Sequence, residues 1–126
     1  MSNIFKYQGD EIAFLVRAYQ DESKTTLINL DNAGNIIVYV FTDGCKKAMF
    51  SKTEKAGYIK LSRINETEYF GVIDSSITKL MAPGALIMEI NIENIIGIDH
   101  GNNPFNIIKK TVFGSLKKSL IKIESL

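Results

Sequence analysis

Apolar and polar residues alternate along several short stretches of this chain. In the clearest stretch, residues 86–92, every second residue is apolar: Leu86, Met88, Ile90 and Ile92. Residues two apart point to the same face of a β-strand, so this pattern predicts a strand with one buried face. A similar alternation between Glu11 and Tyr19 predicts an earlier strand of the same kind.

The chain between residues 66 and 93 predicts a connection between two sheets. Residues 69–74 are rich in β-forming types, and Asp74 followed by two serines can start a short helical turn within residues 75–81. Pro83 and Gly84 then impose a corner before the strand described above. This order of strand, helical turn, corner and strand is typical of a chain that crosses between the two sheets of a β-sandwich.

Further β-prone runs complete an all-β prediction. Residues 36–41 are apolar on both faces, as expected of a central strand, and Asp43-Gly44 predicts a hairpin turn into residues 45–50. Turn-forming residues recur about every ten positions, and no long amphipathic helix is present in the pattern. We therefore expect residues 1–126 to form a single antiparallel β-sandwich of seven or eight strands, with one short helical turn near residues 75–81.

The segments outside these strands are expected to be irregular. Residues 1–8 are interpreted as an N-terminal arm that leads into a turn, and residues 63–67 as a second turn. Residues 105–113 predict a strand with an exposed edge, which Gly114 ends. Residues 115–126 are interpreted as a basic tail; their pattern fits a helix or a strand, and a strand or extended tail packed on a neighbour is favoured.

Composition indicates one ordinary globular domain, with 45% hydrophobic and 23% charged residues. The net charge of +1 argues against a protein whose main role is to bind the phosphate backbone of nucleic acid. Positive charge is concentrated near the C-terminus, where five lysines face a single glutamate: Lys109, Lys110, Lys117, Lys118 and Lys122. These lysines could steer the chain towards an acidic neighbour, or they could simply keep an exposed strand edge soluble.

Candidate catalytic and metal-binding groups are few. The chain has one histidine, His100, and one cysteine, Cys45, so a catalytic pair would have to use both. A tetrahedral zinc site would lack ligands, and the loops 31–35 and 99–103 do not match the pattern of a calcium loop. We therefore expect no enzyme activity, no cofactor and no metal. The sequence shows neither a signal peptide nor an apolar run long enough for a membrane span.

Two parts of the chain resemble immunoglobulin-like domains of tailed-phage virions. Gly9-Asp10 precedes the alternating strand 12–18, and the step Leu30-Asp31-Asn32-Ala33 leads into the strand 36–41. This order is similar to the opening of the N-terminal domain of phage baseplate upper proteins.

The second half continues that resemblance. It contains Tyr69-Phe70-Gly71-Val72, then Thr78 and Leu80 ahead of the Pro83-Gly84 corner, and then the strand 86–92. The aromatic residue that the family usually has after this corner is replaced by Ala85-Leu86. The resemblance covers most of residues 6–113, and it implies an immunoglobulin-like β-sandwich without catalytic residues.

The resemblance also implies a function and a location. A free-standing domain of this type, made in the host cytoplasm, would serve in the virion by decorating the capsid, anchoring a head fibre or joining parts of the tail or baseplate. Its partners would be other virion proteins or copies of itself in an oligomer, through the lysines above and the loop residues Asp99, His100 and Asn102. The alternative is a module that binds carbohydrate or a cell surface through exposed tyrosines.

Overall fold

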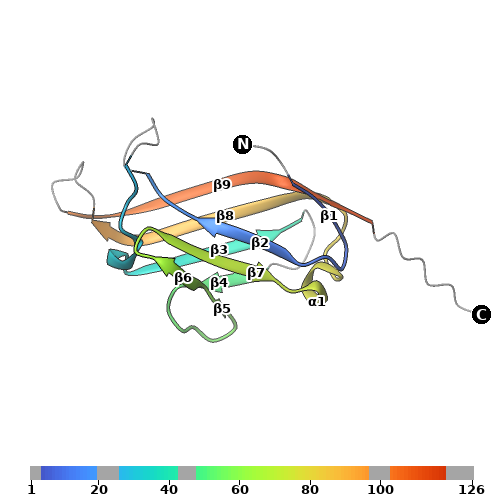
Figure 1. Ribbon diagram of the computed structural model, residues 1–126, viewed down its shortest axis with the longest axis horizontal. Helices are drawn as coiled ribbons and strands as arrows, with labels where there is room; N and C mark the ends of the chain where they lie inside the picture. Colours follow the sequence, from blue (N-terminus) through green and yellow to red (C-terminus); the bar gives the residue numbers. More distant parts are fainter. Residues whose placement is uncertain (1–3, 20–25, 43–47, 97–102, 119–126) are drawn as a thin grey trace, which may run out of the picture.

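Two β-sheets form the body of the computed structural model, which describes residues 4–19, 26–42, 48–96 and 103–118 (Figure 1). The larger sheet contains six strands in the spatial order β1 (Ile4–Tyr7), β9 (Pro104–Lys117), β8 (Gly84–Ile96), β3 (Asn35–Phe41), β4 (Ala48–Ser51) and β5 (Ile59–Lys60). The smaller sheet contains β2 (Ile12–Val16), β7 (Glu68–Ile73) and β6 (Ser62–Asn65). A 3-10 helix, η1 (Leu30–Asn32), and one short helix, α1 (Ser75–Thr78), lie between strands.

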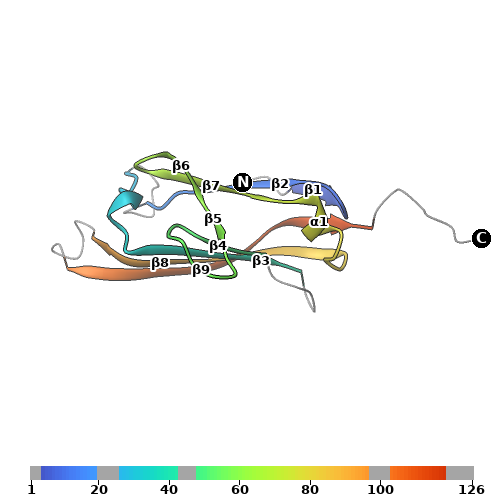
Figure 2. The ribbon, with the colours of Figure 1, turned by 90° about the horizontal axis from the view of Figure 1, so that it is seen from below.

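The two sheets face each other across a hydrophobic core. Figure 2 shows the smaller sheet stacked over the larger one, with the C-terminal part of β9 curling up towards it and carrying β1. Along β2, buried and exposed residues alternate strictly, so every second side chain points at the opposite sheet. The buried side chains of β2 meet those of β3, β4 and β8, among them Val38, Phe50, Leu86 and Ile92.

The predicted crossing between the sheets is confirmed. β7 belongs to the smaller sheet and β8 to the larger one, and α1 joins them at the position expected for a helical turn. α1 spans only Ser75–Thr78, so the helix ends well before the Pro83 corner. The buried Thr78 hydroxyl fixes this connector: it donates to the Asp10 carbonyl (2.7 Å) and accepts from the Gly9 amide (3.1 Å).

The prediction of an all-β fold is confirmed, but the prediction of purely antiparallel pairing is wrong at both edges of the larger sheet. β1 runs parallel to β9, and β5 runs parallel to β4. The predicted central strand at residues 36–41 is confirmed as β3, which pairs with β4 on one side and β8 on the other. The described residues contain nine strands rather than seven or eight, because β1 and β6 form where an arm and a turn were expected. A short strand was also expected at residues 58–61, and β5 lies there.

Two segments expected to be irregular are strands. β1 lies within the predicted N-terminal arm, where Ile4 packs against the core and Phe5 is exposed. β6 occupies most of the predicted turn at residues 63–67 and pairs with β7, although all four of its residues are exposed. A strand without a buried face lacks the apolar alternation that identifies strands from sequence, so this pattern could not reveal β6.

Gly114 does not end the last strand, as was expected. β9 continues through it to Lys117, and its pairing with β8 shifts by one residue at Phe113, which is a β-bulge. A Cβ atom at residue 114 would lie 2.5 Å from the carbonyl oxygen of Ile4, so glycine allows β1 to approach this closely. Gly114 thus has a packing role beside β1.

Part of the predicted basic tail belongs to the body of the protein. Residues 115–117 pair with β1 on one side, and residues 115 and 116 pair with β8 on the other. The Leu116 side chain is 1% exposed and lies in the core cluster. Lys118 is exposed, and Lys122 lies outside the described residues, as do Cys45, Asp99, His100 and Asn102.

We expect Leu116→Ala to lower the free energy of unfolding by about 2–5 kcal/mol, because it leaves a cavity between the sheets. Chemical denaturation monitored by circular dichroism measures this change. Val112→Ala is the matched control on the same strand, since Val112 is 53% exposed, and it should change the stability by less than about 1 kcal/mol. Equal losses in the two variants would contradict the placement of Leu116 in the core.

Candidate functional site

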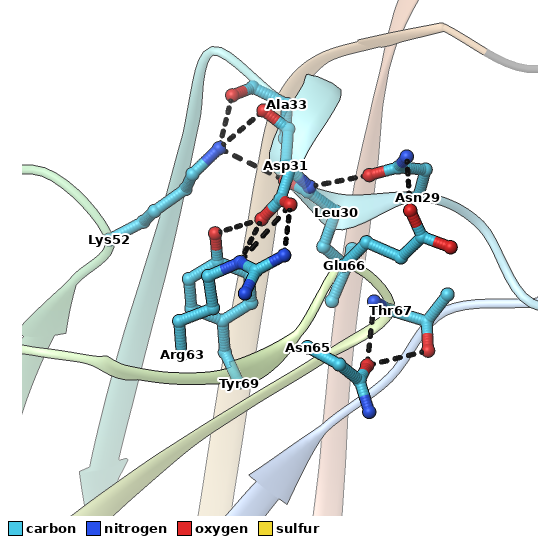
Figure 3. Close-up of polar contacts among 10 residues, drawn as sticks. All are labelled: Asn29, Leu30, Asp31, Ala33, Lys52, Arg63, Asn65, Glu66, Thr67 and Tyr69. Carbon is cyan, nitrogen blue, oxygen red and sulfur yellow. Dashed lines mark hydrogen bonds and ion pairs between the residues drawn. The ribbon is translucent and has the colours of Figure 1, made fainter.

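A cluster of charged and polar side chains lies where η1 meets the smaller sheet (Figure 3), at one end of the two sheets (Figure 1). The Asp31 carboxylate accepts three hydrogen bonds from the Arg63 guanidinium, with Nε at 3.0 and 3.1 Å and Nη2 at 2.8 Å from its oxygens. The Tyr69 hydroxyl donates to the same carboxylate at 2.5 Å. This arrangement ties η1 to β6 and β7.

Lys52, just after β4, connects the same helix to the larger sheet. Its Nζ donates to the carbonyl oxygens of Leu30, Asp31 and Ala33 at 3.0, 2.9 and 2.9 Å. A lysine ammonium has three N–H groups, so these bonds use all of them. Figure 3 shows Lys52 reaching these carbonyls from the side opposite Asn29, whose side chain caps η1 by accepting from the Asp31 amide at 3.0 Å. The cluster therefore joins both sheets through one short helix.

The electrostatics of this cluster move the pKa values of Asp31 and Tyr69 away from neutral pH. Hydrogen bonds from Arg63 and then from Tyr69 lower the pKa of Asp31 to about 2. Burial, together with the hydrogen bond to Asp31, raises the pKa of Tyr69 to about 12. Burial also lowers the pKa of Lys52, but its donors are all engaged. A catalytic acid or base needs a pKa near the working pH, so Asp31 and Tyr69 fit a structural contact better than a proton-transfer site.

The predicted interaction lysines fall into two groups along β9. Lys109 and Lys110 lie in the middle of the strand, whereas Lys117 is its last residue and Lys118 follows directly after it. At about 3.4 Å per residue, seven or eight residues separate the groups by roughly 25 Å. The structure therefore does not gather them into one patch. The ammonium of Lys117 lies 5.8 Å from the ring centroid of Phe5, and that of Lys110 lies 5.6 Å from that of Phe41.

Among the described strands, the middle of β9 forms an open edge of the larger sheet. β8 pairs with β9 along one side from Pro104 to Leu116, but β1 pairs with the other side only from Gly114 to Lys117. Of the described strands, none pairs with Asn106–Val112 on that second side (Figure 1). The sequence-based prediction of an exposed edge on this strand is thus confirmed for Lys109 and Lys110.

Two exposed apolar residues on this edge strand were not predicted from the sequence. Ile108 is 72% exposed and Val112 is 53% exposed. They alternate with the core-facing residues of β9, and they lie on the outer face of the larger sheet together with Lys110. In the sequence, Ile107 and Ile108 are indistinguishable as candidates for the core, and only the register with β8 decides which of them is outside.

A second surface feature surrounds Tyr58, just before β5. The hydroxyl groups of Tyr39 and Tyr58 are 3.0 Å apart, and the ammonium of Lys55 lies 4.8 Å from the Tyr58 ring centroid. The hydrogen bond with Tyr58 is the main cause that raises the pKa of Tyr39. Beside Tyr58 lies an open pocket of about 530 Å³, lined by Glu54, Lys55, Ala56, Tyr58 and Lys60.

Comparisons of the chain with protein-family models, with curated proteins and with solved structures find no significant match. Within residues 4–19, 26–42, 48–96 and 103–118, no three or more side chains of the histidine, cysteine, aspartate or glutamate types come together in a way that could hold a metal ion. In the same part of the chain, the structure contains no helix with the length and apolar character needed to cross a membrane.

We expect stability to depend on pH through Asp31. Its pKa is lower in the folded protein than in the unfolded chain, so the ionised carboxylate stabilises the fold above about pH 4, and this contribution is lost as the pH falls towards about 2. Asp31→Asn removes the charge and should flatten the dependence of unfolding free energy on pH in this window, as measured by urea denaturation.

Arg63→Gln tests the cause of that dependence. Because Arg63 makes the largest contribution to the lowered pKa of Asp31, this variant should also flatten the profile while leaving the carboxylate in place. Adding Asp31→Asn to Arg63→Gln should then cause less change than Asp31→Asn alone. A wild-type pH profile in the Asp31→Asn variant would contradict the role given to this carboxylate.

Proposed function

We propose that this chain is a non-enzymatic structural or adaptor module that acts through protein–protein contacts. The observation that carries the proposal is the open edge of β9. An unpaired edge presents a row of backbone donors and acceptors, and proteins generally cover, shorten or break such edges unless another chain uses them. Here the edge lies on one of the two longest strands of the fold and carries Ile108 and Val112 with their side chains exposed.

The strand order supports the interpretation of this chain as an immunoglobulin-like domain. In the naming of a variable-type immunoglobulin domain, the strands from β2 to β9 correspond in chain order to B, C, C′, C″, D, E, F and G. The smaller sheet then has the order B-E-D, and the strands of the larger sheet beyond β1 have the order G-F-C-C′-C″. β1 lies beside β9 in the larger sheet. Fold alone does not define function, so this correspondence supports the proposal only together with the open edge.

We place this module in the virion of a tailed phage because of the resemblance carried by Gly9-Asp10, residues 30–33 and residues 69–84. In that setting it would decorate the capsid, anchor a head fibre or join parts of the tail or baseplate. Its partners would be other virion proteins or further copies of itself. Nucleic acid, membranes and cofactors have no part in the proposal.

The location can be tested on particles purified from a culture that expresses the gene. We expect the protein to band with intact particles in a density gradient, at a fixed number of copies per particle, when fractions are quantified by immunoblotting. Disruption of the gene should yield particles that lack the protein and that show an altered assembly or surface by electron microscopy. A protein found only in the soluble fraction, away from particles, would contradict the virion role.

A carbohydrate-binding role is the second candidate, and the surface around Tyr58 favours it. Tyrosine rings beside an open pocket can stack on sugar rings, and the pocket adjoins Lys55, Lys60 and Glu54, which offer hydrogen-bonding groups. Tyr39 holds the Tyr58 hydroxyl through the hydrogen bond between the two tyrosines. This role would use the outer face of the larger sheet near β5 rather than the edge formed by β9.

If this second candidate is correct, Tyr58→Ala should abolish binding to any glycan that the wild-type protein selects on an array. Tyr7→Ala is the matched control, since Tyr7 is a partly exposed tyrosine on β1, at the opposite edge of the same sheet. Its binding should remain at the wild-type level. Absence of glycan binding by the wild-type protein, or equal loss in the two variants, would count against a site at Tyr58.

A further inference from the structure

We propose that the open edge of β9 accepts an acidic, extended segment of a partner protein as an added antiparallel strand. The inference rests on the proposed function as an interaction module and names the chemistry of its partner. It concerns the part of β9 from Asn106 to Val112, which we call the β9 edge. The argument combines the free side of this strand, the side chains on its two faces and the sign of its charge.

The geometry limits where a strand can be added. β1 already occupies the side of β9 next to Gly114–Lys117, so an added strand would end where β1 begins. Pro104 stands at the other end of β9 and has no backbone N–H to offer. The β9 edge lies between these two limits, and antiparallel addition is favoured because antiparallel pairs are slightly more stable than parallel ones.

The charge of the edge selects the partner. β9 carries Lys109, Lys110 and Lys117 and contains no aspartate or glutamate. Lys109 and Lys110 are both exposed, and as neighbours in a strand they project to opposite faces. Two consecutive acidic residues on an added strand would therefore meet one lysine on each face. Glu89 is the residue across from Lys110 on β8, so Lys109, which lies across from Ile90, has less competition for a carboxylate.

The exposed apolar residues extend this pattern. Ile108 and Val112 lie on the outer face on either side of Lys110. A complementary segment would run antiparallel to β9. From its N-terminus it would place an apolar residue opposite Val112 and any residue opposite Thr111. Two acidic residues opposite Lys110 and Lys109 and an apolar residue opposite Ile108 would follow. Cross-strand pairs of opposite charge each stabilise a sheet by about 0.2–1 kcal/mol relative to alanine pairs, and the apolar pairs would bury part of the exposed surface of Ile108 and Val112.

The same lysines disfavour a second copy of this chain on the edge. Two β9 strands related by a twofold axis centred on Lys109 or Lys110 would place identical ammonium groups directly opposite each other. Like charges in direct opposition destabilise a strand pair. The β9 edge is therefore better suited to an acidic partner than to self-association.

A synthetic peptide with the sequence Thr-Val-Thr-Glu-Glu-Val-Thr, labelled with a fluorophore, tests this inference on the full chain. We expect saturable binding by fluorescence anisotropy, weakened when the salt concentration is raised from about 50 to 500 mM, because screening reduces charge attraction. Lys109→Glu combined with Lys110→Glu should weaken binding by about tenfold or more. Hydrogen exchange should slow at amides of the β9 edge when the peptide binds.

Two controls separate strand addition from simple charge attraction. Lys55→Glu combined with Lys60→Glu makes the same charge change near the opposite edge of the larger sheet and should leave the affinity unchanged. A peptide of the same sequence with methylated backbone nitrogens keeps its carboxylates but cannot form the ladder, and it should not bind. Thermal unfolding of both lysine variants checks that they remain folded.

Three outcomes would overturn the inference. They are the absence of peptide binding, equal weakening by the two lysine pairs, and equal binding of the methylated peptide. Dimers in analytical ultracentrifugation that dissociate when the β9 lysines are changed would also overturn it, in favour of a second copy on the edge. A protein that bands with particles but fails the peptide test would keep its structural role and lose only the acidic partner, so the two proposals can fail separately.

Discussion

Phe14 of β2 reaches across the core and places its ring against Phe50 of β4 in the opposite sheet. The ring centroids are 4.9 Å apart and the planes are inclined by 78°, the edge-to-face geometry that aromatic pairs prefer. The chain has a single cysteine, so no disulfide within the chain can join the two sheets. Gly71 of β7 makes room for this contact, since a Cβ atom there would lie 2.5 Å from the Phe14 ring.

The contact between Phe14 and Phe50 is linked to the polar cluster around Asp31 through the strands that carry the two rings. Phe14 pairs with Gly71 in the β2–β7 register, and the same register sets Val16 opposite Tyr69. Tyr69 is thereby held at the end of the smaller sheet, where its hydroxyl reaches Asp31. Lys52 follows directly after β4, the strand that carries Phe50, and binds the carbonyls of η1 from the larger sheet. Aromatic packing in the middle and the polar cluster at the end thus fix the same relative position of the two sheets.

Sequence patterns predicted the elements that have a clear local signal: apolar alternation, a continuous apolar run or a helix-starting group of residues. The alternation in residues 86–92, the apolar run at residues 36–41 and the helical turn after Asp74 all correspond to observed elements. β6 was missed because it buries neither face, and β1 because its partner is more than a hundred residues away. The contacts of Asp31 with Arg63 and Tyr69 join residues 32 and 38 positions apart. No local pattern specifies such pairs; they depend on which strands become neighbours.

The parallel pairing of β1 with β9 also has a mechanical consequence. Ile4 lies beside Gly114 and Tyr7 beside Lys117, so the two strands run in the same direction over their shared length. If Ile4 were pulled backwards along its strand while Lys117 was pulled forwards, the force would run parallel to both strands. The hydrogen bonds between the strands would then be loaded together in shear, rather than opened one after another from an end. A module built in this way resists tension along its chain at the junction of its first and last strands.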